Sequence, residues 1–325
     1  MTEIPPGKRA WIPSFFVTGT SPNVSWDDLS TKDQLQFLQS IDPGYFEYVA
    51  GMHVPNLDTE NAIYASIAIR QIHAQAVETF FAVIGSVLQA PDCPAGWILN
   101  YRIGDLRGLI SSIDNYEPFL NRQGVREGSW KAVVRAIFRF SEDNEVLREH
   151  LDASAALWKG LAYHLIHERF DDENSAIKHG LGFNAGEWKM RIRTEGSNVA
   201  FLLQDHQFGT RFPRREKIEG KPRQSYLRFQ RVNWDPKALA NRIPLLVASL
   251  RDVINLQIIH HGGGNLEDYE IALLNREIVT EALADPTGAS ATAWGEQKLF
   301  PYWDAREFSK AEILASYDES DDLSA

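Results

Sequence analysis

The run 58–89 constrains the fold most, because apolar residues surround almost the whole circumference of a predicted helix. Its two apolar stripes consist of Ile63, Ile67, Ala74, Val77, Phe81, Ile84 and Leu88, and of Ile69, Ile72, Ala76, Phe80, Val83 and Val87. Asp58 and Thr59 provide a cap for its start, and Pro91 and Pro94 prevent its continuation. A helix that is apolar on nearly all sides must be enclosed by other helices, so we predict that this run forms the central helix of a bundle.

Several other segments show the periodicity of amphipathic helices. One follows Ser30 or Thr31, and the others lie at about 103–115, 129–140, 144–170, 236–260 and 266–283, with a short one near 308–315. Pro236 opens the helix at 236–260, and the sequence HHGGG at 260–264 ends it, with a glycine supplying the left-handed cap. These helices and the central one predict a mainly α fold, an antiparallel helical bundle.

The periodicity changes from helical to alternating between residues 187 and 232. The sequence WKMRIRTEGSNVAFLLQDH alternates polar and apolar residues on either side of the turn signal 194–197, which predicts two strands of a hairpin. A third strand is expected at 226–232. The charged sequence RFPRREKIEGKPR between them, broken by Pro213, Gly220 and Pro222, predicts an exposed loop. The bundle is therefore expected to carry a small antiparallel β hairpin or sheet insertion at about 187–232.

These patterns divide the chain into four expected segments. They are an extended N-terminal lead-in at 1–28, a helical bundle at 29–182, a β hairpin with a long helix packing on the bundle at 183–285, and an irregular C-terminal segment with an acidic tail at 286–325.

Composition excludes several classes of protein. The single cysteine, Cys93, excludes an intrachain disulfide framework and a cysteine-based zinc site within one chain. The net charge of −11 argues against coating nucleic acid with the whole surface, but it allows a local basic patch. No continuous apolar segment follows Lys8 and Arg9, and no later run reaches about 18 uninterrupted apolar residues. We therefore expect a cytoplasmic protein without a membrane-spanning helix.

Three polar residues, Arg70, His73 and Glu78, lie on the central helix, where few positions are expected to be exposed to solvent. One interpretation is that they form hydrogen bonds with adjacent helices as buried polar groups. The other is that they face a cleft, in which Glu78 would take part in catalysis. Their spacing alone does not decide between the two.

A second polar group lies near the end of the helix at 144–170. His164, His167 and Glu168 follow the spacing i, i+3, i+4, which places them on one side of the helix and can hold a metal with a further ligand. An exposed His/Glu face, or a histidine buried with a partner, explains the same spacing. The H-E-x-x-H motif and paired E-x-x-H motifs are absent, so we expect no metal and no cofactor.

The segment ENSAIKHG supplies the remaining candidate catalytic residues. On a short helix Asn174 and Lys178 are adjacent through the i, i+4 relation, and His179 points sideways. A lysine beside a histidine can bind phosphate or stabilise negative charge, and histidine can transfer protons near neutral pH. The alternative is that Lys178 and His179 complement the dipole of the last helical turn before Gly180.

A mostly helical bundle with an Asn-x-x-x-Lys/His element resembles the HEPN superfamily over about residues 58–182. Active members of that superfamily are RNases, commonly dimeric, and often found in toxin–antitoxin and phage-defence systems. Their motif is Arg, a polar residue that is frequently Asn, three further residues, and His. With Asn174 at the polar position, Glu173 stands where Arg is expected and Lys178 where His is expected, unless His179 serves one residue later. The resemblance implies an HEPN-like fold and a homo-oligomer, and the two substitutions predict reduced catalysis.

The charged segment from Arg211 to Arg231 is the candidate nucleic-acid-binding region. It carries eight basic residues and the acids Glu216 and Glu219, a local charge of +6. Its first six basic residues are Arg211, Arg214, Arg215, Lys217, Lys221 and Arg223. Interleaved Phe212, Tyr226 and Phe229 could stack on bases while the cations meet phosphates. A solvated loop, or one docked on an acidic surface of this chain or of a partner, is the alternative.

Three functions from different classes follow from these observations. The first is a catalytically reduced HEPN-like protein that binds nucleic acid or a protein partner, in bacterial defence. The second is an atypical RNase that uses Lys178 and His179. The third is a structural or interaction scaffold in which every polar group is satisfied internally.

Overall fold

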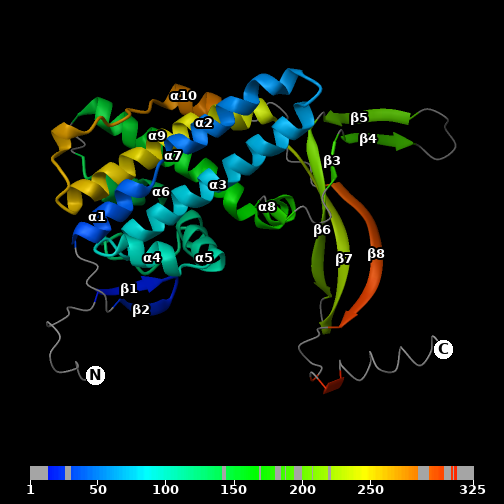
Figure 1. Cartoon of the computed structure of the whole chain (residues 1–325), viewed down its shortest axis with the longest axis horizontal. Coiled ribbons are helices and arrows are strands. Elements are labelled where there is room, and N and C mark those ends of the chain that lie inside the picture. The colour runs from blue at the N-terminus through cyan, green and yellow to red at the C-terminus, as the bar shows by residue number, and fades with distance from the viewer. Residues whose placement is uncertain are drawn as a thin grey trace. The chain divides into compact units, whose positions relative to one another are not determined.

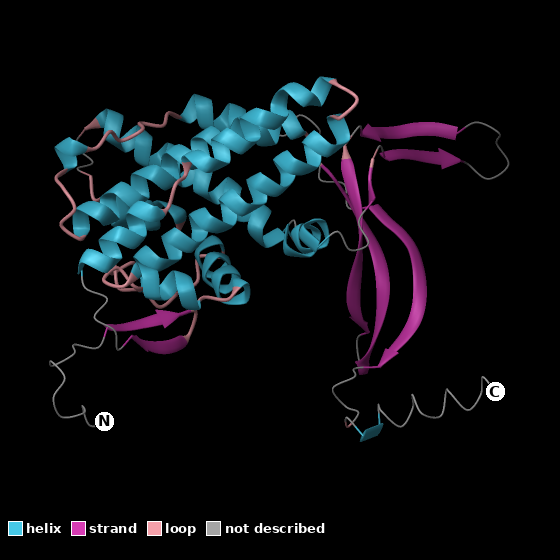
Figure 2. Ribbon diagram, viewed as in Figure 1, coloured by secondary structure: helices cyan, strands magenta, loops and turns pink. Residues whose placement is uncertain are grey.

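The computed structural model describes residues 14–25, 31–140, 144–167, 170–179, 184–186, 188–193, 200–206, 208–218, 221–284, 293–303, 309 and 311–312. The chain forms two compact units. The first comprises Met1–Asn174 and Trp234–Ser290, and the second comprises Ser175–Asn233 and Ala291–Ala325. The predicted mainly α fold with a smaller antiparallel β part is confirmed (Figure 2).

The first unit is a helical bundle (Figure 1). Its helices are α1 (Thr31–Ser40), α2 (Gly44–His53), α3 (Ala62–Gln89), α4 (Pro94–Asn100), α5 (Ile103–Asp114), α6 (Trp130–Phe138), α7 (Glu145–His167), α9 (Pro236–His260) and α10 (Arg276–Leu283), with short 3₁₀ turns at η1 (Val54–Asp58) and η2 (Leu266–Asp268). Helix α8 (Phe170–His179) spans the division between the units.

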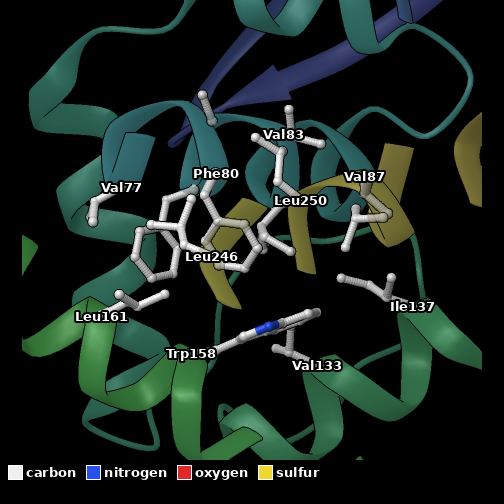
Figure 3. Packing of buried hydrophobic residues seen from close by; sticks show 14 of the residues in the cluster. Val77, Phe80, Val83, Val87, Val133, Ile137, Trp158, Leu161, Leu246 and Leu250 are labelled. Atoms are coloured by element: carbon white, nitrogen blue, oxygen red, sulfur yellow. The ribbon is translucent and has the colours of Figure 1, made fainter. Parts of the chain in front are cut away.

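Helix α3 lies in the core of this bundle, as its sequence predicts. Its side chains are buried from Ala65 onwards on most sides, and it packs against α2, α4, α5, α7 and α9. Figure 3 shows Phe80, Val83 and Val87 of α3 packed with Trp158 of α7 and Leu250 of α9. Burial of each such side chain contributes about 1.5–3 kcal/mol, so this cluster holds the helices together.

Side-chain caps begin two of the helices, whereas the cap predicted at Asp58 and Thr59 is not found, because α3 follows Asn61 without a side-chain cap. The Ser129 hydroxyl accepts a hydrogen bond from Ala132 N, and the Asp235 carboxylate accepts from Lys237 N and Ala238 N. Gly262 follows α9 with φ of 78°, the left-handed conformation that glycine adopts without strain. Helix α3 begins at Ala62 rather than near Asp58, because residues 54–58 form a separate 3₁₀ turn.

The described residues of the expected lead-in at 1–28 are extended, and they form a β hairpin. Strands β1 (Ser14–Thr18) and β2 (Ser21–Ser25) form an antiparallel hairpin. Its turn contains Gly19, whose N–H donates to Gln89 Oε1 at 3.1 Å, and Phe16 is buried in the core. The hairpin is thereby fixed to the end of α3.

The second unit contains antiparallel strands. Strands β3 (Asn184–Ala185), β6 (Gly209–Ile218), β7 (Lys221–Asn233) and β8 (Ala293–Trp303) form one sheet in the order β3-β6-β7-β8. Strands β4 (Trp188–Arg193) and β5 (Ala200–His206) form the predicted hairpin (Figure 1). Its predicted turn at 194–197 and the whole acidic tail lie outside the described residues.

Two sequence predictions are corrected by this sheet. The sequence RFPRREKIEGKPR is not an exposed loop: most of it lies in β6 and β7, paired residue by residue. The segment 286–325 is not irregular throughout, because β8 pairs with β7. Pro213 and Pro222 suggested a loop, but both lie within strands of the sheet.

Helix α9 is the one described helix that is long and apolar enough, by length and composition, to span a membrane. Its mean hydropathy reaches 1.3 over the most apolar window. It packs against α3, and it also carries Arg242 and Asp252, both buried. A position in the core of the bundle therefore accounts for its apolar composition.

Candidate functional site

Glu78 of α3 is engaged with a tyrosine of the first unit. The Tyr101 hydroxyl donates a hydrogen bond to Glu78 Oε1 at 3.1 Å, and the Tyr101 ring stacks on Trp97 with centroids 5.2 Å apart. Burial, followed by the charge of Glu78 and this hydrogen bond, raises the pKa of Tyr101. Tyr101 therefore remains a hydrogen-bond donor. Because Tyr101 directly follows α4, its bond to Glu78 holds the end of α4 against α3.

The other three candidate catalytic residues lie on α8. Lys178 is exposed, and Asn174 is half-buried, with Oδ1 lacking a hydrogen-bond partner among the described residues. His179 is the last residue of α8, and the structure does not describe its side chain. Glu78 and Asn174 belong to the first unit, and Lys178 and His179 to the second. Within the described part of the first unit, no hydrogen bond joins Glu78 to Asn174.

Glu173, at the position where the HEPN motif has Arg, forms a buried ion pair. Arg70 donates to Glu173 Oε2 through Nε at 3.1 Å and through Nη2 at 2.8 Å. The Arg70 guanidinium also lies over the ring of Trp234, 5.2 Å from its centroid. Arg70 and Glu173 are 2% and 1% exposed, so a substrate cannot reach either group.

His164 also has a buried partner. Arg242 Nη1 lies 2.9 Å from His164 Nε2, and since arginine only donates, Nε2 is the acceptor of this hydrogen bond. The His73 ring meets the His164 ring edge to face at 6.0 Å. Burial, followed by His164, Arg242 and Arg70, lowers the pKa of His73 well below its ordinary value. Arg70 is therefore a hydrogen-bonded group of the core, and His73 is buried beside it with its ring against that of His164.

The candidate metal ligands are only partly described. Glu168 and the side chain of His167 lie outside the described residues, and His164 Nε2 is occupied by Arg242. Among the described residues no three His, Cys, Asp or Glu side chains gather in a way that could hold a metal ion.

A cleft of about 790 Å³ opens on the first unit, between α6, α7 and the start of α10. It is lined by Tyr116, Glu127, Ser129, Trp130, Lys131, Glu145, Arg148, Glu149, Asp152, Ala155, Ala156, Lys159 and Arg276. Its basic and acidic residues are balanced in number, and Lys131 Nζ bonds to Asp152 Oδ1 at 2.9 Å. Sequence reasoning missed this cleft, because its residues come from separate helices and follow no motif.

Strand pairing separates the predicted nucleic-acid-binding residues onto two faces of the sheet. Arg211 pairs with Arg231, and Arg215 pairs with Leu227, which in turn pairs with Lys298 of β8. Because residues alternate between faces and paired residues share a face, five cations lie on the same side. We call this side the basic face; its cations are Arg211, Arg215, Lys217, Arg231 and Lys298.

The other side of the sheet, the opposite face, is less basic. Arg214 pairs with Arg228 there, and Glu216 pairs with Tyr226. Phe212 lies on this face and is completely buried, so it is unavailable to stack on a base. Lys221 and Arg223 lie in β7 beyond the register shift that follows Lys217, and their faces do not follow from the pairing. The basic cluster is therefore two unequal sets. Among the paired positions only the smaller set includes an acid, Glu216, while Glu296 of β8 lies at the register shift between Gly295 and Gln297 and its face does not follow from the pairing.

Comparison of this chain with protein-family models, with curated proteins and with solved structures found no match.

Proposed function

We propose that this chain is an HEPN-like helical protein with reduced catalysis that binds nucleic acid through the basic face of the sheet β6-β7-β8. The helical bundle and the placement of Asn174 and Lys178 on one short helix support the HEPN-like relationship. The engagement of Glu173 by Arg70 supports reduced catalysis, because a buried carboxylate replaces the cation of the motif.

The segregation of charge on the sheet carries the binding proposal. On β6 and β7 the paired positions of the basic face, from Gly209 to Lys217 and from Ser225 to Asn233, include no aspartate or glutamate, although the whole chain carries a net charge of −11. The acid of β8, Glu296, lies at a register shift and is assigned to neither face. Cations on one face attract a polyanion, and phosphate contacts supply most of the affinity of such complexes. This charge pattern suits the phosphates of nucleic acid better than an acidic surface of the same chain, which would leave the face without a function.

Reversal of charge on the basic face is the test. In Arg215→Glu with Lys217→Glu, binding of a short fluorescein-labelled RNA of mixed sequence is measured by anisotropy over a range of salt concentrations. Each lost phosphate contact reduces the slope of log K against log salt by about 0.7–0.9, so we expect a slope shallower by about 1.4–1.8 and weaker binding at low salt.

The matched control is Arg214→Glu with Arg228→Glu, which makes the same change of net charge on the opposite face. The RNA repels this variant at long range as strongly as it repels the basic-face variant. Because the control loses no phosphate contact, we expect its salt slope to remain that of the native protein. Equal losses in the two variants, or no RNA binding by the native protein at low salt, would contradict the proposal.

The same RNA pool distinguishes binding from catalysis. A catalytically reduced protein binds the pool and leaves it intact during long incubation. Cleavage by the native protein that disappears in a folded His179→Ala variant would instead assign an RNase activity to Lys178 and His179. Neither binding nor cleavage would favour an interaction scaffold.

A further inference from the structure

Helix α2 is apolar on two sides, and the bundle covers only one of them. Phe46 and Ala50 are buried in the core, where α2 packs against α3 and α9 (Figure 1). On the other side Tyr45, Tyr48 and Met52 are 53%, 67% and 48% exposed. Their spacing i, i+3, i+7 places them in one stripe along the helix. A helix that is apolar on nearly all sides is normally enclosed, so this stripe is a surface that a partner would cover.

The stripe continues onto the elements that follow α2. Val54 lies in η1, and Ile63 and Tyr64 lie in the first turn of α3; both elements pack against α2. We call the whole surface the α2 face; its residues are Tyr45, Tyr48, Met52, Val54, Ile63 and Tyr64, and they are 38–74% exposed. At about 150–250 Å² for a whole aromatic side chain, the three tyrosines alone expose roughly 300–480 Å². Apolar patches of this size are the largest on a typical monomer and often mark an interaction site.

The charge around the α2 face is acidic. Residues 41–69, which carry this face, include no lysine or arginine. Their four acids are Asp42, Glu47, Asp58 and Glu60. From α9, Lys237 reaches Asp58 at 3.1 Å and Arg251 reaches Glu47 at 3.9 Å. Four acids against two cations leave a charge of −2, and in the described part of the chain the other two acids take part in no ion pair. A surface of this sign attracts a cationic partner.

We propose that the α2 face binds an amphipathic helix of a partner protein, one whose apolar stripe is bordered by lysine and arginine. Helices pair through apolar residues spaced as those of α2 are, because such residues face one neighbour over several turns. Tyrosine and methionine are enriched at the centre of protein interfaces, whereas the rim is polar, and the α2 face has both features. No residue of the basic face takes part, so this site is independent of the proposed nucleic-acid binding.

Two other occupants fit the α2 face less well. A second copy of the chain would bring the same acidic surroundings and a net charge of −11, so the two faces repel each other. A standard protein interface also buries ~800 Å² on each partner, which is more than the exposed tyrosines provide. Helices that lie on membranes carry lysine and arginine beside their apolar side, and residues 41–69 have neither.

The test uses labelled synthetic helical peptides with leucine at positions a and d of each heptad. In one peptide lysine fills the other positions, and in a second peptide glutamate fills them. A third has the composition of the first, but its leucines are scattered. Fluorescence anisotropy measures binding to the whole chain. We expect the first peptide to bind at least about tenfold more tightly than the other two, because only it combines an apolar stripe with cations.

Removal of the exposed side chains locates the site. Tyr48→Ser with Met52→Ser should weaken binding of the first peptide about 10- to 30-fold, since a few aromatic anchors contribute most of the affinity of an interface. Tyr64→Ser, on α3, should weaken it in the same direction. The matched control is Leu99→Ser with Tyr116→Ser, whose native side chains are 74% and 61% exposed outside the α2 face. We expect its affinity to stay within about twofold of native. Circular dichroism shows whether each variant is folded.

Several outcomes would overturn this inference. No binding of the first peptide, equal affinity for the lysine and glutamate peptides, or equal losses in the two double variants would show that the α2 face is not such a site. Sedimentation equilibrium and flotation with neutral phospholipid vesicles examine the other occupants. Self-association of the native chain, or its binding to vesicles, that disappears in Tyr48→Ser with Met52→Ser would assign the face to a second copy or to a membrane instead.

Discussion

At the scale of single residues, Asp252 of α9 and His150 of α7 hold the chain that precedes α10. Asp252 Oδ1 accepts a hydrogen bond from Ala272 N at 3.2 Å, and His150 Nδ1 accepts one from Leu274 N at 3.0 Å. Both side chains are buried. Because these backbone donors are bound to side chains, the predicted helix at 266–283 is interrupted, and only its two ends are helical.

Asp252 predicts a dependence of stability on pH. Burial raises the pKa of Asp252 to about 7, although the hydrogen bond from Ala272 and the charge of Arg251 oppose this. In the unfolded chain this carboxyl ionises near pH 4. Its contribution to the free energy of unfolding is therefore fully present below about pH 4 and is lost as pH rises through about 7. The loss from this group is as much as about 4 kcal/mol.

The variant Asp252→Asn checks this prediction in urea unfolding at a series of pH values. Asparagine keeps an acceptor for Ala272 N and does not ionise, so the variant should lose less stability than native protein between pH 4 and pH 8. Burial lowers the pKa of His150, so its contribution has the opposite sign and falls at acidic pH. His150 is present in both proteins and cancels in their difference. Parallel pH profiles would show that Asp252 does not titrate in this range.

At the scale of elements, α4 approaches α3 closely at Gly85. A Cβ atom at Gly85 would lie 2.5 Å from Cη2 and 2.7 Å from Cζ2 of Trp97. The Trp97 ring is fully buried, and its Nε1 donates to Gln89 Oε1 at 3.0 Å, so the ring is held in place. The glycine that interrupts the apolar pattern of α3 therefore makes room for an indole ring.

The substitution Gly85→Ala should reduce the free energy of unfolding by about 1–3 kcal/mol. Alanine is the better helix former by about 1 kcal/mol, but the clash with Trp97 outweighs this gain. The control is Gly108→Ala on the exposed side of α5, where a Cβ would have no atom within 4 Å. This variant should be more stable than native protein by about 0.5–1 kcal/mol. Chemical denaturation measures both, and stabilisation by both substitutions would refute the packing argument.

At the scale of the whole molecule, Arg70 fixes both points at which the first unit continues into the second. The chain leaves the first unit after Asn174 and returns at Trp234. Arg70 bonds to Glu173 just before the first crossing and lies over Trp234 at the second. One side chain of the central helix therefore anchors both connections.

Removal of the Arg70 guanidinium should lower the free energy of unfolding. Arg70→Met leaves the Glu173 carboxylate buried and unpaired, so we expect a loss of about 3–5 kcal/mol in the free energy of unfolding, and faster amide exchange at 170–174 and 234–238. The double variant Arg70→Met with Glu173→Leu should recover part of the loss, because no charge then remains buried.

The exposed pair Lys131–Asp152 provides the control for this experiment. Its side chains are 60% and 48% exposed, so Lys131→Met should cost less than about 1 kcal/mol. Similar small losses in the two single variants would mean that the buried pair does not anchor the connections.

The sequence by itself determined the helical bundle and its central helix. A helix with apolar residues on nearly all sides, such as 62–89, removes them from water only when other helices enclose it. The hairpin β4-β5 was also predictable, since alternation and a short connection are local properties.

Only the tertiary structure decided the partners of the polar groups and the faces of the sheet. Arg70 finds Glu173, and His164 finds Arg242, across large separations in sequence that no spacing encodes. The sequence of β6 and β7 predicted a loop because prolines and charged residues outnumber apolar ones at 211–223. Strand β8, which pairs with β7, comes from a distant segment of the chain. Pairing among these strands, rather than local propensity, sets which cations share a face, because register is a property of two chain segments together.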